Sequence, residues 1–328
     1  MRGGSSPFAR TNFKKVGEDM FFYYVSFPDG EQELCEMEIR HLFGIELKEK
    51  YFFYDEYIDI NRSPYTNYCI KVDAEALSLE ELLEVIKQKN ISYNDFKVQY
   101  ISLFERMDLN KKHKVESLIG GSIKGKVSIH EPKVKVGVID FKDRWIVGEI
   151  IKNKRIWNLH DKKPVQYCNS LTSRVSRALV NIAVGKNNSL KLVDPCCGIG
   201  TVLLEALSMG IDVKGYDINY KVVKGARENL KFFGYPDIVK RSDIKDVDKY
   251  FDVAVVDLPY GVLSVTNKEL QKDIIRHTAR ISKKAVFVTL EDMREVISYY
   301  DFEVKDFCKI RKAKFFRYVT LAVVKNKK

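Results

Sequence analysis

The sequence predicts an α/β fold with a mostly parallel sheet in its second half, and two observations support this. Short apolar runs rich in β-branched residues recur between residues 192 and 256, and helical patterns separate them. Strands that alternate with helices in this way form a parallel sheet. The second observation is that an acidic residue stands at or just after the end of four such runs: Asp194, Asp217, Asp243 and Asp257. Because ligands of such sheets bind beyond the carboxyl ends of the strands, we expect these carboxylates to line one crevice.

Seven strands are expected in this sheet, with amphipathic helices between them. The first four strands are the short runs Leu192–Val193, Val213–Tyr216, Ile238–Val239 and Val253–Val256. The last three are Ala285–Leu290 and a closing hairpin of Phe302–Ile310 and Phe315–Val324. Helical patterns occur at Val222–Leu230, Leu270–Ile281 and Met293–Tyr300.

The sequence of the first half of the chain predicts a smaller structure of the α+β class. Gly44 ends one expected helix, and Gly120-Gly121 is expected to end another. Strands are expected at Phe21–Phe27, Tyr51–Ile60, Tyr68–Val72, Phe96–Ile101, Val134–Phe141 and Arg144–Ile151. Helices are expected at Glu31–Phe43, Leu77–Ile86 and Lys111–Ile119.

A glycine loop, Asp194–Thr201, follows the first strand of the large sheet. It lacks the third glycine of the dinucleotide fingerprint, because Leu203 stands at that position. A dinucleotide needs backbone amides at a helix N-terminus for its pyrophosphate. S-adenosylmethionine has no phosphate and carries an ammonium, a carboxylate and a sulfonium. Asp194 suits the ammonium, and Gly198 and Gly200 allow a close approach of the backbone. The alternative is an ordinary tight turn without a ligand.

Two further strand-end acids suit the other parts of the same molecule. Asp217 is placed to accept both ribose hydroxyls, and Asp243 is placed to accept the adenine amino group. We therefore predict S-adenosylmethionine as the cofactor. The predicted contact residues are Asp194, Cys196, Gly198, Gly200, Thr201, Asp217, Ile218, Asp243, Ile244 and Asp257.

The fourth acid begins the sequence Asp-Leu-Pro-Tyr-Gly, which ends at Gly261. This sequence resembles the Asp/Asn-Pro-Pro-Tyr motif of methyltransferases that act on exocyclic amines of bases, with Leu258 in place of a proline. Such an amine is a poor nucleophile. A carboxylate at Asp257 and the carbonyl of Leu258 or Pro259 can accept its hydrogens and aim its lone pair. Tyr260 can stack on an extruded base. The predicted catalytic residues are Asp257, Pro259 and Tyr260, and the alternative is a turn with no chemistry.

Two segments before the large sheet carry further resemblances. The order Ile119-Gly120, Ser122-Ile123, Pro132 and Ile146-Val147-Gly148 resembles the end of a THUMP domain, an RNA-binding module of tRNA-modifying enzymes. The alternative is a generic small α+β domain. Asn158–Val184 resembles the segment before the catalytic domain of THUMP-containing guanine-N2 methyltransferases, although Lys163-Pro164 and Cys168-Asn169 replace the Arg-Pro and His-Pro pairs usual there.

Within the second of these segments, Ser170 is expected to cap a helix. Arg174 and Arg177 lie three residues apart on one face of that helix. They are expected either to meet a phosphate or the cofactor entrance, or to form a solvated basic face. The expected organisation is an α+β, ferredoxin-like subdomain at 1–75, a THUMP-like domain at 76–152, a linker with this helix at 153–190, and a methyltransferase domain at 191–328.

The formal charge of +11, from 56 basic and 45 acidic residues, favours a polyanionic partner, although it also promotes solubility. One basic group, Lys309–Arg317, is interleaved with Phe315, Phe316 and Tyr318. This is typical either of nucleic-acid contact or of a hairpin whose aromatics face the core. The six cysteines form no metal-ligand pattern, so no metal is expected. No signal peptide or long apolar run is evident, so we expect a cytoplasmic protein without a membrane partner.

Together these resemblances imply a class I, Rossmann-like methyltransferase preceded by a THUMP-like domain. Its expected reaction is methyl transfer from S-adenosylmethionine to the N2 amine of a guanosine in RNA, most often tRNA, by a monomer. Two alternatives stay open at this point. One is a DNA adenine or cytosine amino-methyltransferase, and the other is a non-catalytic RNA-binding protein that retains the cofactor pocket.

Overall fold

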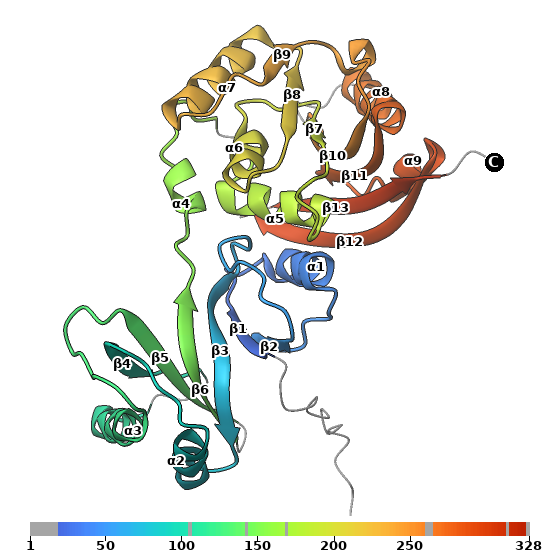
Figure 1. Cartoon of the computed structure of the whole chain (residues 1–328). Helices are drawn as coiled ribbons and strands as arrows, with labels where there is room; N and C mark the ends of the chain where they lie inside the picture. Colours follow the sequence, from blue (N-terminus) through green and yellow to red (C-terminus); the bar gives the residue numbers. More distant parts are fainter. Residues whose placement is uncertain are drawn as a thin grey trace, which may run out of the picture. The chain divides into compact units, whose positions relative to one another are not determined.

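The computed structural model describes residues 19–103, 107–141, 144–167, 170–259, 265–312 and 315–325 of the 328-residue chain. Two compact units are interleaved along the sequence (Figure 1). The first consists of Met1–Tyr23, Phe53–Tyr57 and Cys69–Ile151, and the second of Tyr24–Phe52, Ile58–Tyr68 and Lys152–Lys328. This division differs from the four consecutive segments expected, because residues 24–52 and 58–68 pack with the second half of the chain.

The N-terminal half forms a six-stranded sheet with the order β2-β1-β3-β6-β5-β4. Its outer strands β4 and β5 are parallel, and β5 and β6 are antiparallel. The bounds are β1 (Phe21–Val25), β2 (Tyr51–Tyr54), β3 (Thr66–Ala76), β4 (Phe96–Tyr100), β5 (Val134–Phe141) and β6 (Arg144–Lys152).

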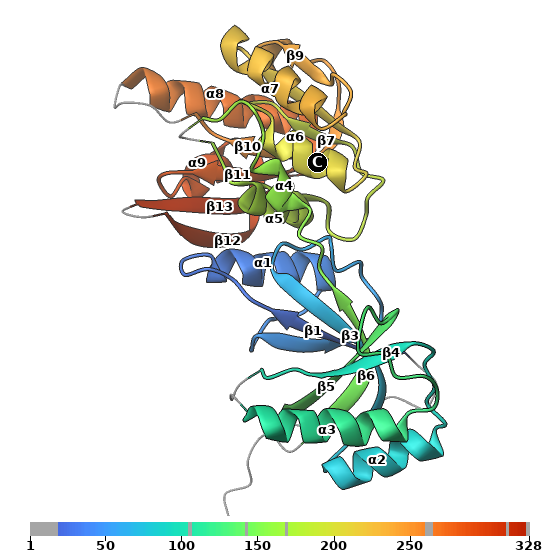
Figure 2. The ribbon, with the colours of Figure 1, turned by 90° about the vertical axis from the view of Figure 1, so that its left-hand side faces the viewer.

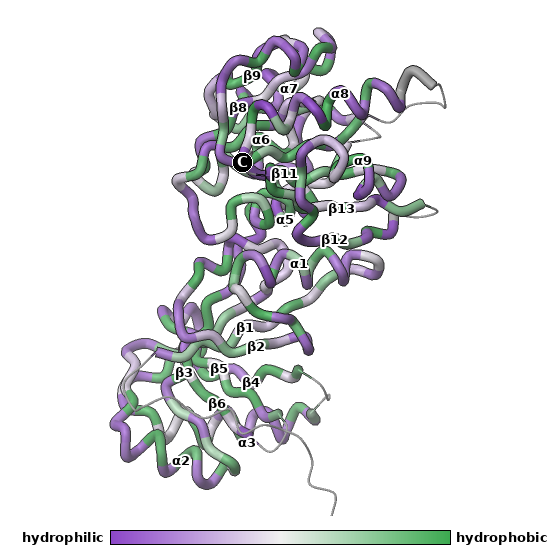
Figure 3. The backbone as a smooth tube through the Cα atoms, turned by 90° about the vertical axis from the view of Figure 1, so that its right-hand side faces the viewer, coloured by the Kyte–Doolittle hydropathy of each residue, from purple (hydrophilic) through white to green (hydrophobic). Residues whose placement is uncertain are grey.

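Helices α2 (Leu79–Gln88) and α3 (Leu109–Ser122) lie side by side on this sheet (Figure 2). Hydrophobic and hydrophilic residues alternate along both helices, as amphipathic packing requires (Figure 3). The expectation that Gly120-Gly121 ends α3 was wrong, because the helix continues to Ser122. A glycine costs about 1 kcal/mol in a helix interior. The burial of Val115 and Ile119 against β4 outweighs that cost.

The second unit contains the predicted seven-stranded sheet, with the order β12-β13-β11-β10-β7-β8-β9. The pairs from β11 to β9 are parallel, whereas β13 is antiparallel to both β11 and β12. The bounds are β7 (Leu192–Asp194), β8 (Val213–Asp217), β9 (Val239–Arg241), β10 (Phe251–Asp257), β11 (Ser282–Thr289), β12 (Phe302–Lys312) and β13 (Phe315–Val324). The mostly parallel α/β sheet is therefore confirmed.

Helices cover both faces of this sheet. On one face, residues of α8 and α9 share a buried cluster with Ala254 and Val256 of β10. Since strand residues alternate between faces, the buried Val253 and Val255 point to the other face, where α5 contacts β10. The helices are α4 (Trp157–His160), α5 (Ser173–Val184), α6 (Thr201–Ser208), α7 (Tyr220–Phe232), α8 (Val265–Ile281), α9 (Arg294–Tyr299) and the short 3-10 helix η1 (Ile244–Asp246).

Helix α5 begins two residues later than Ser170 would place it. Thr172 is the N-cap, and its hydroxyl accepts the backbone N–H of Val175 at 3.3 Å. The hydroxyl of Ser170 instead donates to the carbonyl of Tyr167 at 2.8 Å. Ser170 as the helix cap was therefore wrong, because the chain turns once more before it becomes helical.

The two arginines of α5 do not form a solvated basic face. Arg177 is only 2% exposed and donates to Glu205 on α6 at 2.8 Å and to the carbonyl of Asn61 at 2.6 Å. The other oxygen of Glu205 lies 2.6 Å from a ring nitrogen of His160. Arg174 makes two hydrogen bonds to Glu31, at 2.8 and 3.1 Å. Both arginines therefore bind carboxylates of the protein itself, and neither is placed to meet a phosphate.

Residues before position 52 also cover the edge strand β12. Helix α1 (Gln32–Phe43) contacts both α5 and β12. The backbone N–H of Lys309 donates to Glu33 at 2.8 Å, and that of Arg311 donates to the carbonyl of Gly30 at 2.9 Å. Exposed edge strands promote aggregation, so this cover protects the sheet. The unit that carries the methyltransferase sheet therefore includes residues far upstream of position 158.

Candidate active site

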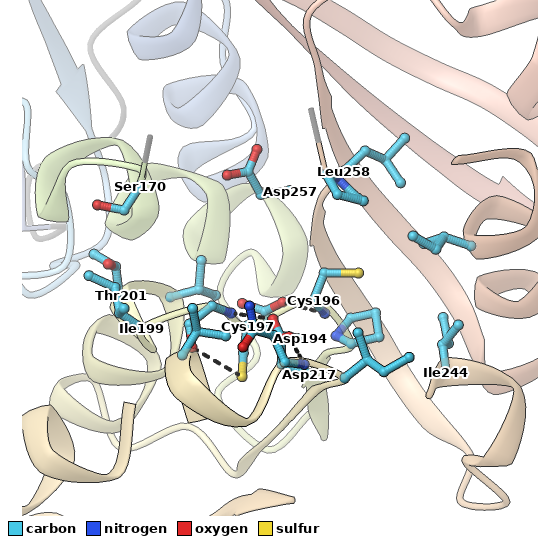
Figure 4. A pocket seen from close by; sticks show the side chains of 18 of the residues that line it. Ser170, Asp194, Cys196, Cys197, Ile199, Thr201, Asp217, Ile244, Asp257 and Leu258 are labelled. Atoms are coloured by element: carbon cyan, nitrogen blue, oxygen red, sulfur yellow. Dashed lines mark hydrogen bonds between the residues drawn. The ribbon is translucent and has the colours of Figure 1, made fainter. Parts of the chain in front are cut away.

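A cavity of about 380 Å³ opens at the carboxyl ends of β7, β8 and β10. Its volume is in the range of small-ligand sites. All four predicted acids line it, and no lysine or arginine is among the described residues that do so. Figure 4 shows Asp194 between Asp217 and Asp257 in this cavity. The lining residues are Tyr167, Ser170, Leu171, Asp194, Pro195, Cys196, Cys197, Gly198, Ile199, Thr201, Val202, Asp217, Ile218, Asn219, Val222, Ser242, Asp243, Ile244, Asp257, Leu258, Pro259, Leu270 and Ile274.

The glycine loop places two left-handed residues between β7 and α6. Gly198 has φ +51°, and a Cβ there would meet nothing within 4 Å, so the backbone is open to a ligand. Gly200 has φ +82° and begins α6 as its N-cap, where a Cβ would lie 3.3 Å from Ala226. Gly200 does not line the cavity. In the structure it is the residue that starts α6, and its contact with the cofactor stays a prediction.

Leu203 stands where the dinucleotide fingerprint has its third glycine, and a glycine in the neighbouring strand makes room for it. Leu203 is fully buried, and a Cβ on Gly215 of β8 would lie 2.5 Å from its Cδ1. Close packing of α6 on the sheet therefore depends on a glycine in the strand rather than in the helix. A glycine at 203 would leave that space empty.

Asp194 is the most buried of the four acids, at 3% exposure. Its Oδ1 accepts the backbone N–H of Cys196 at 3.2 Å. Burial raises the pKa of Asp194 well above its usual value, and the nearby carboxylates of Asp257 and Asp217 raise it further. A cation bound beside these acids would favour their ionised forms. The cavity is therefore suited to a positively charged ligand.

Asp217 is held in place by two backbone amides. Its Oδ2 accepts from Gly198 at 3.0 Å and its Oδ1 accepts from Asn219 at 2.8 Å. Burial raises the pKa of Asp217. Each carboxylate oxygen has a second lone pair, which can accept a hydroxyl of a sugar.

Beyond Asp217 the cavity is apolar. Ile218 is 64% exposed although it is hydrophobic, and it lines the cavity together with the buried Ile244. These two side chains offer surfaces for the faces of a flat heterocycle. Asp243 is the N-cap of η1, and its Oδ1 accepts the backbone N–H of Lys245 at 3.1 Å. Its Oδ2 lies 3.5 Å from the ammonium of the same lysine, so an adenine amino group would share Asp243 with that lysine.

Thr201 supplies a further polar group. Its Oγ1 is buried in the first turn of α6 and has no hydrogen-bond partner among the described residues. A buried hydroxyl without a partner is costly, which favours a ligand that bonds to it. Together with the acids and the apolar end, this residue fits S-adenosylmethionine, whose ammonium and sulfonium need anionic surroundings. The lining of the cavity is therefore compatible with the predicted cofactor.

The Asp-Leu-Pro sequence ends β10 at the same cavity. Asp257 is the register partner of Val288 in β11, and the backbone N–H of Leu258 donates to the carbonyl of Val288 at 3.0 Å. Proline has no such N–H, so leucine extends the ladder by one residue. The side chain of Leu258 is fully buried, which keeps Asp257 at the mouth of the cavity. Tyr260, the third predicted catalytic residue, lies outside the described residues.

Several lining residues were not predicted from the sequence. Tyr167, Ser170 and Leu171 come from the turn before α5, and Leu270 and Ile274 come from α8. The helical periodicity of Leu270 and Ile274 marked them as core residues and gave no sign of a ligand. In addition, the side chain of Gln271 donates to the carbonyl of Pro259 at 2.9 Å. Only the folded chain reveals this contact, because twelve residues separate the pair.

Among the described residues, no group of histidine, cysteine, aspartate or glutamate side chains is placed to hold a metal ion. In the same part of the chain, no helix is long and apolar enough to span a bilayer.

Comparison with known proteins finds similarity over the part of the chain that forms the cavity. Residues 160–298 match the model described as UPF0020, RMKL-like, methyltransferase domain. A tRNA (guanine(10)-N2)-dimethyltransferase of Methanothermobacter thermautotrophicus is 31% identical over 214 residues, which cover 62% of each chain. The enzyme of the same name from Pyrococcus abyssi is 29% identical over 210 residues, covering 58% of this chain and 61% of that protein.

A third relative acts on another RNA. The mouse U6 snRNA (guanine-N(2))-methyltransferase THUMPD2 is 33% identical over 118 residues, covering 34% of this chain and 22% of that protein. The chain spans about three fifths of the length of the two archaeal relatives. The match to the UPF0020 model, like the alignments to these relatives, covers only part of the chain.

Proposed function

We propose that this protein transfers a methyl group from S-adenosylmethionine to the N2 amine of a guanosine in tRNA. The observation that carries the proposal is the position of Asp257 and Pro259 at the mouth of the cavity that holds the cofactor-binding acids. The names of the two archaeal relatives support guanine N2 as the acceptor and tRNA as the substrate.

The chemistry required of the protein is modest. The cofactor supplies a methyl group on a sulfonium, which is already electrophilic. The amine nitrogen attacks the methyl carbon, the carbon–sulfur bond breaks with its electron pair on sulfur, and a proton passes from the nitrogen to water. The carboxylate of Asp257 and the carbonyl of Pro259 accept the two amine hydrogens. They thereby hold the nitrogen closer to tetrahedral and aim its lone pair at the methyl group. Stacking of the base on Tyr260 is part of the same proposal.

Gln271 is proposed to fix the direction of the Pro259 carbonyl. A carbonyl oxygen has two lone pairs, so it can accept from the Gln271 amide and from a substrate amine together. Because the Gln271 contact comes from α8, the helix that follows the motif also positions its backbone.

Two observations favour RNA as the partner and tRNA over U6 snRNA. Exposed lysines of α3, Lys111 and Lys114, provide positive charge on the unit that contains the THUMP-like sequence. The alignments to the tRNA enzymes extend over about 210 residues, whereas that to the U6 snRNA enzyme covers 118. We further propose that the protein acts in the cytoplasm as a monomer. The free cysteines among the described residues, including the adjacent Cys196 and Cys197, suit a reducing compartment.

Cofactor affinity tests the assignment of the ribose contact. Replacing Asp217 by alanine removes the acceptor of two hydroxyl groups and also the partner of the Gly198 amide. Hydrogen bonds to a charged group contribute about 1.5–3 kcal/mol each, so we expect S-adenosylmethionine affinity to fall at least about tenfold. Titration calorimetry measures this, with Asp237→Ala as the control, since Asp237 pairs with Arg227 on the surface. Unchanged affinity in Asp217→Ala would remove Asp217 from the cofactor site.

The product identifies the reaction. Purified protein is incubated with unmodified tRNA transcripts and methyl-labelled S-adenosylmethionine, and the RNA is then digested to nucleosides for mass spectrometry. We expect the label in N2-methylguanosine or its dimethyl form. Label in an adenosine or cytidine would contradict guanine specificity. If the label is transferred only when a U6 snRNA or a DNA duplex replaces tRNA, the proposal that tRNA is the substrate is contradicted.

A further inference from the structure

The β12–β13 hairpin carries a continuous strip of aromatic and basic side chains on one face. In the antiparallel register, Lys309 is paired with Tyr318 and Arg311 with Phe316. Directly paired residues share a face, and so do residues two apart in a strand. The strip consists of Phe307, Lys309, Arg311, Phe316 and Tyr318, and it is joined by Arg294 of α9.

Ring contacts order the inner part of this strip. The rings of Phe307 and Tyr318 have centroids 5.9 Å apart. The guanidinium of Arg294 lies 4.0 Å from the centroid of Phe307, and the ammonium of Lys309 lies 5.4 Å from that of Tyr318. Such cation–π contacts hold the long side chains against the hairpin. The strip is therefore a preformed surface.

The outer end of the hairpin leaves two phenyl rings in solvent, Phe316 on the face of the strip and Phe315 on the opposite face. Phe315 is 43% exposed and Phe316 is 48% exposed. The alternative that these aromatics face the core is therefore wrong, because both lie beyond the point where β13 pairs with β11. An exposed ring such as that of Phe316, next to basic side chains on the same face, is typical of surfaces on which nucleobases stack.

The register of the sheet locates these rings beside the catalytic crevice. Asp257 is paired with Val288, and Thr289, one residue further along β11, is paired with Tyr318. Phe316 and Phe315 precede Tyr318 by two and three residues, so they extend roughly 7–10 Å past the carboxyl edge of the sheet. Strand β13 is two strands from β10, which is a lateral separation of about 10 Å. The rings thus stand on the same edge as the acceptor site.

The charge of the strip suits a polyanion. Asp292 makes an ion pair with Arg294 at 2.6 Å and neutralises it. Lys309 lies near the same carboxylate, whose pKa is lowered chiefly by its hydrogen bond to Arg294 and slightly by Lys309. Glu33 accepts the backbone N–H of Lys309 at the strand edge. Against the two carboxylates of Asp292 and Glu33, the strip offers Arg294, Lys309 and Arg311, which leaves a surplus of one positive charge for phosphates.

We propose that this strip binds the RNA strand that flanks the target guanosine. Bases next to the extruded guanosine stack on Phe316, and their phosphates contact Lys309 and Arg311 on the same face of the hairpin. The inference rests on the proposed function, because it takes RNA as the substrate. It adds a second RNA contact that lies on the catalytic unit itself, next to the crevice.

The test compares tRNA affinity of the full-length protein with that of Phe316→Ala and of Lys309→Gln/Arg311→Gln. We expect the aromatic variant to bind tRNA about tenfold more weakly or worse. We expect the charge variant to reduce the slope of log affinity against log salt by about two. Phe232→Ala is the matched control, because Phe232 is also an exposed phenylalanine, at 61%, but lies at the far end of α7. S-adenosylmethionine affinity and thermal stability should be unchanged in all three variants.

The outcomes separate the two proposals. An active wild-type enzyme whose aromatic variant binds tRNA within twofold would overturn the strip and leave the proposed function intact. A wild-type protein that neither binds nor methylates tRNA would overturn both. Phe316→Tyr keeps an aromatic ring, so it should bind tRNA almost as tightly as the wild type, whereas Phe316→Ala should not. Equal loss of affinity in both variants would contradict stacking.

Discussion

Replacing Asp257 by alanine is expected to slow methyl transfer by about 100- to 1000-fold. In the proposed mechanism the carboxylate at the end of β10 accepts one hydrogen of the acceptor amine, and the neighbouring Pro259 carbonyl cannot hold both hydrogens. Affinity for S-adenosylmethionine should stay near that of the wild type, because Asp217 and the glycine loop remain in place. Single-turnover transfer of labelled methyl to tRNA gives the rate, and calorimetry gives the cofactor affinity.

Asp252→Asn is the matched control for this experiment. Asp252 lies at the opposite end of the same strand and pairs with Lys283 on the surface. It should leave the rate unchanged. Asp257→Asn keeps the shape and one acceptor oxygen, so we expect a rate between those of the wild type and Asp257→Ala. Near-normal turnover in Asp257→Ala would remove this residue from the mechanism.

Replacing Arg177 by alanine is expected to destabilise the second unit by about 3–5 kcal/mol. The change leaves the buried Glu205 without the guanidinium that lies 2.8 Å away, and it leaves the carbonyl of Asn61 without its donor. An uncompensated buried charge costs far more than the surface pair of Arg276 and Asp273 contributes, which is about 0–1 kcal/mol. Urea unfolding followed by circular dichroism measures the difference, with Arg276→Ala as the control.

The same substitution also tests whether α5, α6 and residues 58–68 fold as one body. If Arg177→Ala and Arg276→Ala unfold at the same urea concentration, the buried cluster does not stabilise the unit. A large loss in Arg177→Ala alone would support the packing of Asn61 and α6 around one arginine.

The sequence predicted the catalytic sheet and its acids because those signals are local. Each strand of the parallel sheet is a short apolar run, and each acid follows its strand directly, so the fold places Asp194, Asp217 and Asp257 together. The glycine loop was equally local, since left-handed backbone at Gly198 and Gly200 favours glycine. Gly200 nevertheless serves to start α6, and nothing in the loop sequence separates that role from contact with a ligand.

The features that were missed depend on contacts between distant segments. Arg177 is buried because it binds Glu205 and the carbonyl of Asn61, and the spacing of residues within α5 cannot reveal these partners. The assignment of residues 24–52 to the catalytic unit depends on how Gly30 and Glu33 meet β12, some 280 residues away. The helix α3 continues through two glycines because packing of its apolar side outweighs their low propensity. Local propensity alone could not predict any of these.

A crystal structure of the protein with S-adenosylhomocysteine tests the central claim most directly, because it shows which atoms each acid contacts. We expect the ribose hydroxyls within hydrogen-bond distance of Asp217 and the adenine between Ile218 and Ile244. We expect the amino group of the homocysteine near Asp194, and the sulfur facing Asp257 and Pro259. A ligand bound outside this cavity, or one whose adenine lies against Asp257, would contradict the assignment of the acceptor site.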